Sequence, residues 1–488
     1  MLTRLKVHGF KNLANVDVSF GPFTCIAGAN GVGKSNLFDA ITFLSALADR
    51  PLMEAAKSVR DERNRAGDVR SLFLKHGLEH VDDMSFEAEM LVSPTGSDDL
   101  GQTATAATTF LKYSLVLRYC RDESSPSAER LEVIKEELDY ITRGKSKSQL
   151  QFPNTLEWRN SVVTGVTRRG APFLSTVGEG ADRKVKMHQD GRSGIPRELP
   201  AGNLPRTVLS SANAGESPTA LLARREMQSW RLLQLEPSSL RDSDPFNAPA
   251  HVGVDGSHLA STLHHLARKE IGNGHGQGKE PSIFARVANR LSLLVENVRE
   301  VKIDEDRQRE LFTLQIVDRE HNLHAARALS DGTLRFLALA VLEHDPDAQG
   351  LLCFEEPENG IHPERIAPML ELLKDLCVDT AEPVGDENPL RQVIVNTHSP
   401  AVVGLVGDED LIVAEPREVV IHSKRCQGVG FSWLSGTWRH RAFPNVRTVS
   451  KGILRAYLNP FAFSEPALRP RVKDRTDLNM LLPFPDET

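Results

Sequence analysis

Alternating apolar and polar residues open the chain and predict two β-strands, LTRLKVHGF at 2–10 and NVDVSF at 15–20. The apolar run FTCIAG at 23–28 predicts a short buried strand that leads directly into a glycine-rich loop. Beyond that loop, NLFDAITFLSAL at 36–47 has its apolar residues at helical spacing. The start of the chain therefore predicts the order strand, glycine loop, helix.

A second group of alternating segments predicts an antiparallel lobe beside the first sheet. These are MSFEAEMLV at 84–92, KYSLVLRY at 112–119 and RLEVIKEELDYI at 130–141. The region 144–218 is rich in Gly, Pro and Arg and keeps no periodicity for long, so it predicts a loop-rich segment.

Helical patterns return in 217–235, 256–269 and 282–295, and strand patterns follow at 298–306 and 311–318. No heptad repeat continues for three or four heptads, which argues against a long coiled-coil arm. We expect four regions: an N-terminal lobe at 1–141, a basic and helical insertion at 142–285, a C-terminal lobe at 286–415 and a small tail at 416–488.

Composition places the chain among globular proteins, because 40% of its 488 residues are apolar and 26% are charged. Its apolar runs fall far short of the ~20 residues that cross a bilayer. The first residues lack the apolar core of a signal peptide. We therefore expect a cytoplasmic protein without membrane spans. The five cysteines are scattered and form no CxxC pair, which argues against structural zinc and disulfides.

Charge is distributed unevenly along the chain, whose net charge is −7. Residues 143–206 hold twelve Lys/Arg and five Asp/Glu, a balance of +7, so the rest sums to −14. This basic stretch is a candidate contact for nucleic-acid phosphates. A solvated loop is an equally open interpretation, because few aromatic residues interleave with the charges. The stretch contains Lys145, Lys147, Arg159, Arg168, Arg169, Arg183, Lys184 and Lys186.

The loop GANGVGKS fits the phosphate-binding pattern G-x-x-x-x-G-K-[ST] through Gly28, Gly33, Lys34 and Ser35. In such a loop the backbone N–H groups surround the phosphates, the lysine reaches the β- and γ-oxygens, and the serine hydroxyl binds Mg²⁺. The alternative is a plain glycine-rich turn. The preceding strand and following helix favour a nucleotide site formed by Gly28, Asn30, Gly31, Gly33, Lys34, Ser35 and Asn36.

Two further strands end in polar residues. GLLCFEEPENGIHP carries Glu355 and Glu356 at the end of a buried strand, where one carboxylate can hold Mg²⁺ and the next can orient the attacking water. QVIVNTHSP ends in His398, a candidate sensor of the γ-phosphate. A fourth segment, ALSDGTLRFLALAVL, predicts a helix capped by Ser330, and taken alone it is an ordinary capped helix.

In this order the four segments resemble the Walker A, signature, Walker B and His-switch motifs of ABC-type and SMC-like ATPase heads. The resemblance is greatest to bacterial AAA-family ATPases of the OLD-like group, which are related to RecF and SMC heads. It covers residues 1 to about 415, with a patchy middle. It implies an α/β P-loop NTPase fold of ABC/SMC-head type: a mixed sheet with flanking helices, an antiparallel β lobe and an inserted helical or loop region.

Carried onto this sequence, the resemblance makes Glu356 the catalytic carboxylate, assisted by His398 and Lys34, and gives Ser35 and Glu355 to Mg²⁺. It places Asn359 in the D-loop and makes Ser330 and Gly332 contacts to ATP on a partner subunit. The implied assembly is a homodimer that closes on ATP. The chain departs from the pattern in two ways: the signature reads SDGT, with Asp331 for a glycine, and the Mg²⁺-side acid is Glu355 instead of aspartate. In SMC-like heads the stretch equivalent to Lys11 and Asn12 touches the nucleotide. No Q-loop is located.

A Toprim nuclease follows the ATPase in many members of the OLD-like group, but the residues after Glu415 lack its glycine and later D-x-D pair. We therefore expect no nuclease here and a separately encoded effector, a nuclease or toxin, as partner in anti-phage defence or DNA repair. Two alternatives stay open. One is a transporter's ATPase subunit, which rarely needs nearly 300 residues between its Walker A and signature motifs. The other is a scaffold that binds ATP without hydrolysing it.

Overall fold

The computed structural model describes residues 1–59, 69–121, 129–165, 170–190, 194–272, 282–293, 295, 297–421 and 424–458. The chain divides into two compact units, Met1–Thr448 and Val449–Thr488. The described part of the second unit contains one helix, α13 (Lys451–Leu458). Within the described residues, we find no helix with both the length and the apolar character needed to span a membrane.

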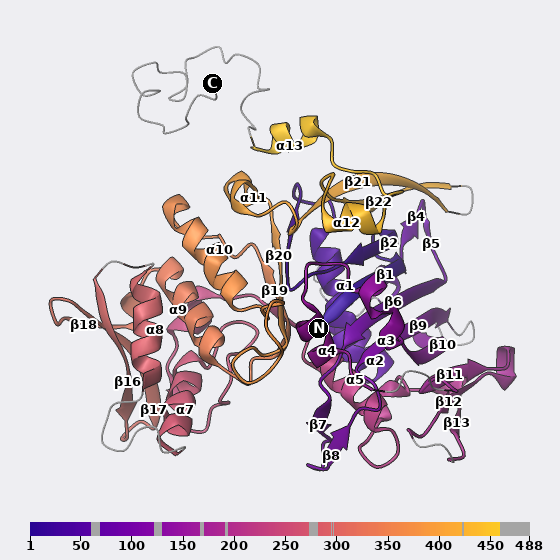
Figure 1. The fold of residues 1–488 in the computed structure, drawn as a ribbon, viewed down its shortest axis with the longest axis horizontal. Helices are drawn as coiled ribbons and strands as arrows, with labels where there is room; N and C mark the ends of the chain where they lie inside the picture. Colours follow the sequence, from indigo (N-terminus) through magenta and orange to yellow (C-terminus); the bar gives the residue numbers. More distant parts are fainter. Residues whose placement is uncertain are drawn as a thin grey trace. The chain divides into compact units, whose positions relative to one another are not determined.

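A six-stranded sheet forms the centre of the first unit. Its strands are ordered β14–β19–β20–β3–β21–β22, and Figure 1 labels β19, β20, β21 and β22. The first five run parallel and β22 runs antiparallel to β21. Their bounds are β14 (Arg231–Leu233), β19 (Gly350–Glu355), β20 (Arg391–Thr397), β3 (Phe23–Ala27), β21 (Leu411–Ile421) and β22 (Lys424–Ser432). The parallel order brings the carboxyl ends of β3, β19 and β20 to the same edge, the usual place for a ligand in such sheets.

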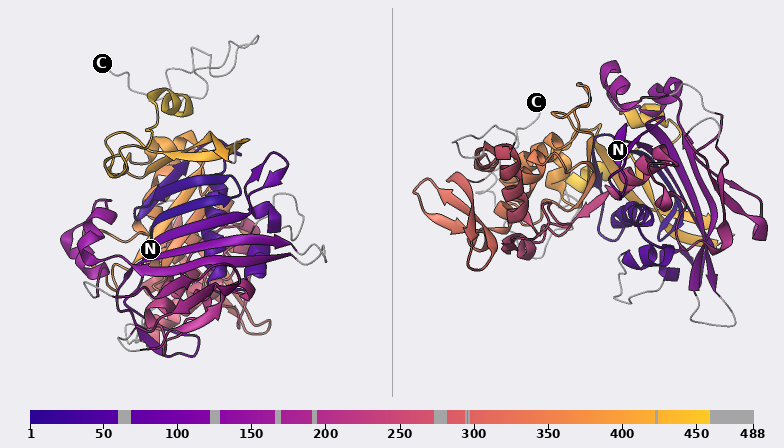
Figure 2. Two further views of the ribbon diagram at one scale, coloured as in Figure 1. Left: turned by 90° about the vertical axis from the view of Figure 1, so that its right-hand side faces the viewer. Right: turned by 90° about the horizontal axis from the view of Figure 1, so that it is seen from below.

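An eight-stranded antiparallel sheet lies beside it and confirms the predicted antiparallel lobe (Figure 2). Its order is β13–β12–β11–β10–β9–β6–β1–β2. The bounds are β1 (Leu2–Phe10), β2 (Leu13–Ser19), β6 (Asp83–Leu91), β9 (Phe110–Arg121), β10 (Glu129–Tyr140), β11 (Leu174–Val177), β12 (Lys184–Met187) and β13 (Arg197–Pro200).

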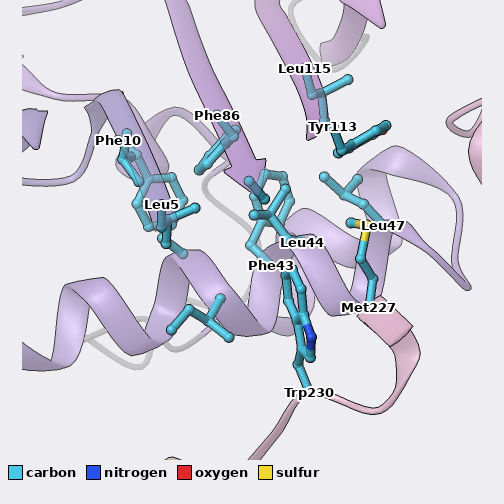
Figure 3. Packing of buried hydrophobic residues seen from close by; sticks show 14 of the residues in the cluster. Leu5, Phe10, Phe43, Leu44, Leu47, Phe86, Tyr113, Leu115, Met227 and Trp230 are labelled. Carbon is cyan, nitrogen blue, oxygen red and sulfur yellow. The ribbon is translucent and has the colours of Figure 1, made fainter. Parts of the chain in front are cut away.

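Helix α1 (Lys34–Leu47) follows the glycine loop, as the sequence predicted. Its buried side chains join one hydrophobic cluster that contains residues of both large sheets. In that cluster Phe43 stacks on Phe10 at a ring-centroid distance of 5.8 Å and meets Phe86 at 5.7 Å (Figure 3). Burying large aromatic side chains contributes strongly to stability, so this cluster fixes α1, and the loop before it, against both sheets.

A smaller sheet of β15 (Asp244–Pro245), β16 (Val298–Asp306), β17 (Leu311–Asp318) and β18 (Leu323–Ala325) packs against α7 (Leu259–Gly272) and α8 (Ser282–Ser292). Helix α8 also contacts α9 (Asp331–His344). The remaining described elements are α2 (Leu52–Ser58), α3 (Arg143–Gln149), α4 (Leu156–Val162), α5 (Pro218–Gln228), α6 (Pro237–Arg241), α10 (Ile366–Asp375), α11 (Pro400–Leu405), α12 (Trp438–Ala442), six 3₁₀ turns, and the short strand pairs β4 (Lys75–His76) with β5 (Glu79–His80) and β7 (Thr95–Ser97) with β8 (Thr103–Thr105).

The structure corrects two sequence-based predictions. Residues 144–218 are less loop-rich than predicted, because β11, β12 and β13 extend the antiparallel sheet; each has only four residues, too few to show alternation. The single helix predicted at 217–235 ends at Gln228, and residues 231–233 form β14 beside β19. A short apolar run is compatible with a buried strand as well as with a helix. Here it forms the edge strand of the six-stranded sheet.

The predicted region boundaries after residues 141, 285 and 415 all fall inside the first compact unit. The last of them lies within β21, and β22 beyond it belongs to the six-stranded sheet. The α/β P-loop class, with a mixed sheet, flanking helices and an antiparallel β lobe, is confirmed.

Candidate nucleotide-binding site

The glycine loop joins the buried strand β3 to α1, and Lys34 is the first residue of that helix. The Lys34 ammonium donates to the carbonyl oxygens of Gly28 at 2.7 Å and Ala29 at 3.0 Å, so the side chain folds across its own loop. Burial lowers the pKa of Lys34, and the nearby carboxylates of Glu356, Glu358 and Glu355 oppose this. The ammonium group of Lys34 is therefore bonded to carbonyl oxygens of its own loop, with three carboxylates in the surroundings.

Asn12 lies in the turn between β1 and β2 and forms hydrogen bonds with the glycine loop and with α1. Its Nδ2 donates to the Val32 carbonyl at 2.8 Å, and its Oδ1 accepts from Asn36 Nδ2 at 2.8 Å. Gly33 has φ +114°, and a Cβ there would come within 2.3 Å of Asn12 Nδ2. Only glycine fits this close approach in this backbone conformation. Lys11 pairs with Asp39 of α1 at 2.8 Å. Asn12 and Lys11 therefore hold the loop and helix in place.

The Walker B acids lie at the end of β19. Two amides from other strands orient Glu355: Gln234 Nε2 donates to its Oε2 at 3.0 Å, and Asn396 Nδ2 donates to its Oε1 at 3.3 Å. Gln234 follows β14 and Asn396 lies in β20, so the neighbours of β19 on either side hold this carboxylate. A carboxylate fixed in this way is suited to bind a hard cation beside the phosphates.

Glu356 forms a pair with His398. Its Oε1 lies 2.6 Å from His398 Nδ1, and its Oε2 accepts from Asn359 Nδ2 at 2.9 Å. Glu356 has φ +45°, an uncommon value for a residue with a side chain, and its N–H donates to the carbonyl of Asn396 at 3.0 Å. Such strained positions cluster at functional sites. The structure thus brings together two candidate catalytic residues that are 42 positions apart in the sequence.

These groups surround one cavity of about 500 Å³. Nine of the predicted site residues line it: Asn30, Gly31, Gly33, Lys34, Ser35, Asn36, Glu355, Glu356 and Asn359. Gly28 and His398 are not among the lining residues, but each contacts one that is, through the Lys34 and Glu356 hydrogen bonds. Ser330 and Gly332 also lie outside the lining of this cavity.

Ser330 caps helix α9, as the sequence predicted. Its hydroxyl accepts from the Thr333 N–H at 3.2 Å and lies 2.8 Å from the Thr333 hydroxyl. Gly332 is buried, and a Cβ there would come within 3.1 Å of the Gly360 carbonyl oxygen. The start of α9 therefore packs against the turn that follows the Walker B acids.

The sequence interpretation missed four polar residues of the cavity lining, Gln234, Glu236, Arg335 and Asn396. Gln234 could have been recognised as a polar residue directly after a short apolar run. The prediction of a single helix over residues 217–235 hid this pattern. Asn396 lies in a strand that the sequence did predict. It could have been recognised because it is a polar residue near the end of an otherwise apolar run. Arg335 lies within α9, where an amphipathic pattern says nothing about which side chain faces a cavity.

The donor set at the cavity fits Mg²⁺. Ser35 and Glu355 offer a hydroxyl and a carboxylate, the oxygen ligands this ion prefers. The described residues contain no cluster of three or more His, Cys, Asp or Glu side chains suited to a metal. A magnesium ion bound together with nucleotide phosphates needs only one or two protein carboxylates, so this arrangement is sufficient.

Two family models match the chain. One, described as "AAA domain", matches residues 4–151, which contain the glycine loop. The other, described as "AAA domain, putative AbiEii toxin, Type IV TA system", matches residues 265–404, which contain the signature, Walker B and His398 segments. The chain is an AAA-type P-loop protein. A search of curated proteins found no match to this sequence. Membership of the OLD-like group and the lack of a Toprim nuclease stay predictions.

Solved structures similar to this AAA-type protein include three SMC heads. An SMC head bound to the C-winged helix domain of ScpA has 14% identity and a TM-score of 0.47, covering 89% of this chain and 98% of that one. An SMC head with an extended coiled coil, bound to the C-terminal domain of ScpA derived from Pyrococcus furiosus, has 12% identity and a TM-score of 0.44, covering 88% and 96%. The SMC head from Thermotoga maritima has 11% identity and a TM-score of 0.36, covering 89% and 99%.

Proposed function

We propose that this protein binds ATP with Mg²⁺ in the cavity beside the glycine loop and hydrolyses it. The observation that carries the proposal is the Glu356–His398 pair, because Glu356 lines the same cavity as Lys34 and Ser35. A phosphate loop alone would support binding. A carboxylate hydrogen-bonded to a histidine beside that loop also supports hydrolysis, because water must be oriented for attack on the γ-phosphate.

Each residue has a distinct role in the proposed reaction. The loop N–H groups and the N-terminal end of α1 hold the phosphates, and Lys34 exchanges its carbonyl partners for phosphate oxygens. Ser35 and Glu355 would hold Mg²⁺, which neutralises charge on the phosphates when bound. Glu356 orients the attacking water and accepts its proton. The water oxygen bonds to the γ-phosphorus as the bond to the ADP oxygen breaks, which leaves ADP and inorganic phosphate. His398 holds Glu356 in position and approaches the released phosphate.

We further propose that two copies close on ATP, with Ser330 and Gly332 of one copy completing the other's site. This part of the proposal rests on the resemblance to ABC-type heads and on the position of both residues outside the lining of their own cavity. Such a dimer acts as a switch, because contacts made only in the closed state shift the equilibrium toward it. The description of the model matching residues 265–404 names a toxin of a toxin–antitoxin system, which favours an effector partner over a transporter.

The surface contacts weaken the case for nucleic acid as a partner. In the basic stretch, Arg183 pairs with Glu132 at 2.9 Å, and Lys184 and Lys186 pair with Glu198 at 3.0 and 2.7 Å. Paired side chains on a strand surface are less available for phosphate contacts than free ones. Arg168 and Arg169 lie outside the described residues. The solvated-face interpretation of the stretch therefore gains support.

The test measures ATP turnover by the purified protein, with and without double-stranded DNA, at low and moderate salt. We expect Mg²⁺-dependent turnover that Glu356→Gln lowers by ~100-fold or more while ATP affinity is retained, since binding does not need this carboxylate. Binding without any turnover in the wild type would instead support the scaffold alternative. Turnover that DNA raises and salt suppresses would replace the protein partner with nucleic acid.

A further inference from the structure

Arg335 lies one turn inside α9 and faces the same cavity as the glycine loop. Its side chain is half-buried and lines the cavity together with Lys34, Ser35, Glu355 and Glu356. Its Nε donates to the carbonyl oxygen of Leu235, in the loop after β14, at 3.1 Å. The guanidinium is therefore held at a defined place in the wall of a cavity that the first residues of α1 also line.

This guanidinium lacks the partner that other arginines nearby have. Arg241 pairs with Asp331 at 2.5 Å, and Arg290 pairs with Glu343 at 2.9 Å. Among the described residues, Arg335 has no carboxylate within 4.0 Å, and the Leu235 carbonyl is its only hydrogen-bond acceptor. Burial lowers the pKa of Arg335, and the more distant acids Asp331, Glu236 and Glu358 oppose this. Arginine nevertheless stays charged in proteins.

A half-buried charge without an ion partner is costly unless something compensates it. Here Arg335 lines a cavity, so an anion in that cavity can compensate the charge. The bound phosphates of a nucleotide carry several negative charges, and Lys34 is the other cationic side chain in the lining. Guanidinium groups bind phosphate oxygens through paired hydrogen bonds, which a compact ammonium cannot do.

We propose that Arg335 binds the phosphate tail of the nucleotide held by its own chain, so that α9 supplies a phosphate-binding residue in cis. This inference rests on the proposed function, because it needs a nucleotide in the cavity. It gives one helix two roles: Ser330 and Gly332 at its start lie outside the cavity lining, and Arg335, one turn later, belongs to it. Charge stabilisation by an arginine near the transferred phosphoryl group also speeds phosphoryl transfer.

The turn after Walker B leaves room for this side chain. A Cβ on Gly360 would come within 3.3 Å of Arg335 Nη1, and Gly360 has φ +76°, where glycine is favoured. The guanidinium thus lies between the Leu235 loop and the Gly360 turn. A phosphate that draws Arg335 toward the nucleotide would also pull on α9, and so connect the cavity to the signature end of that helix.

The experiment compares wild type, Arg335→Gln and Arg335→Lys. The control is Arg327→Gln, which removes one positive charge from an exposed position just before α9 that does not line the cavity. Affinities for ATP, ADP and AMP are measured by titration, and kcat and KM for ATP by phosphate release. We expect Arg335→Gln to weaken ATP binding about tenfold or more, ADP binding less and AMP binding hardly at all. Arg335→Lys should recover part of the loss, and Arg327→Gln should match wild type.

Two outcomes would overturn the inference. One is an Arg335→Gln variant with wild-type affinity and turnover. The other is an equal loss of affinity for all three nucleotides, which a general structural role would produce. If Arg335→Gln does not fold, Arg335→Lys and Gly360→Ala give the same comparison, since the latter crowds the guanidinium. A wild type that binds nucleotides in an Arg335-dependent way without turnover would contradict the proposed hydrolysis alone.

Discussion

Charged residues behave differently at the edge of the parallel sheet and on the antiparallel sheet. At the parallel edge, Lys34 donates to backbone carbonyls and Arg335 to one carbonyl, and neither has a carboxylate within ion-pair distance among the described residues. On the antiparallel sheet, Lys186 and Glu198 are direct cross-strand neighbours, and Lys184 shares the same carboxylate. At the edge of the parallel sheet the cationic side chains line a cavity. On the antiparallel sheet they form ion pairs with a carboxylate of the neighbouring strand.

The difference follows from sheet geometry. Opposite residues of antiparallel strands lie close together, so unlike charges pair along the surface and stabilise it slightly. The carboxyl ends of parallel strands instead meet at an edge where loops and helix ends converge, and side chains there point into shared space. Net local charge alone, at +7 for residues 143–206, therefore says less about ligand binding than whether the cations have partners.

The largest effect should come from Lys34→Ala. Removing this ammonium takes away the charge that reaches the phosphates, and we expect ATP turnover to fall ~100-fold or more, with weaker ATP binding. Phosphate release and nucleotide titration measure both. Lys57→Ala, on the exposed face of α2, is the matched control and should leave both values unchanged. Normal turnover by Lys34→Ala would mean that the cationic side chains lining the cavity matter no more for ATP turnover than the paired ones on the antiparallel sheet.

A smaller effect is expected from Gln234→Ala. Gln234 orients Glu355 through a 3.0 Å hydrogen bond, so its loss should lower kcat by about tenfold and raise the Mg²⁺ concentration needed for half-maximal turnover. A magnesium titration of phosphate release measures this. Gln228→Ala, at the end of α5 and outside the cavity lining, should keep the wild-type magnesium requirement. An unchanged requirement in Gln234→Ala would mean that Glu355 needs no such support.

Glu136 of β10 gives a test of charge inside the antiparallel sheet. Its carboxylate is fully buried and accepts from the N–H groups of Val208 and Leu209, each at 2.8 Å. Burial raises its pKa to about 7. The folded state therefore keeps a proton that the unfolded state releases above pH ~4.3, so this group's contribution to stability is fully present at low pH and falls as the pH rises to about 7.

The thermal midpoint of wild type relative to Glu136→Gln should accordingly be higher at pH 5 than at pH 8. The difference corresponds to a few kcal/mol at most, since one pKa unit is worth ~1.4 kcal/mol. Thermal unfolding at both pH values measures it. Glu137→Gln, one position along β10 and facing the other side of the sheet, is the control and should not change the pH dependence. Parallel curves for wild type and Glu136→Gln would rule out this titration.

The smallest effect should come from a double variant, Lys184→Ser with Lys186→Ser. Exposed ion pairs contribute little to stability, so we expect the thermal midpoint to move by no more than about 2 °C and ATP turnover to stay at the wild-type level. Turnover with and without double-stranded DNA is measured alongside. A DNA response present in wild type and lost in this variant would show that pairing with Glu198 does not withdraw these lysines from phosphate contacts.

Local sequence patterns were sufficient for the parts of this protein that depend on neighbours in the chain. The strand–loop–helix order around Lys34, the two acids after β19 and the histidine after β20 each follow from a run of a few residues, because hydrophobic periodicity and motif spacing are local properties. The Ser330 cap of α9 is equally local. The predicted site residues make up nine of the eighteen residues that line the cavity.

Only the tertiary structure decided how those segments meet and which other residues join them. Gln234 reaches Glu355 across 121 positions, and Asn12 reaches Asn36 across 24. β14 has only three residues, so its own pattern cannot distinguish strand from helix, and pairing with β19 settles it. In the sequence, Arg335 looks like any other polar residue of an amphipathic helix. Only the packing of α9 shows that it lines the cavity. Contacts between distant segments depend on how sheets and helices pack, which no local pattern encodes.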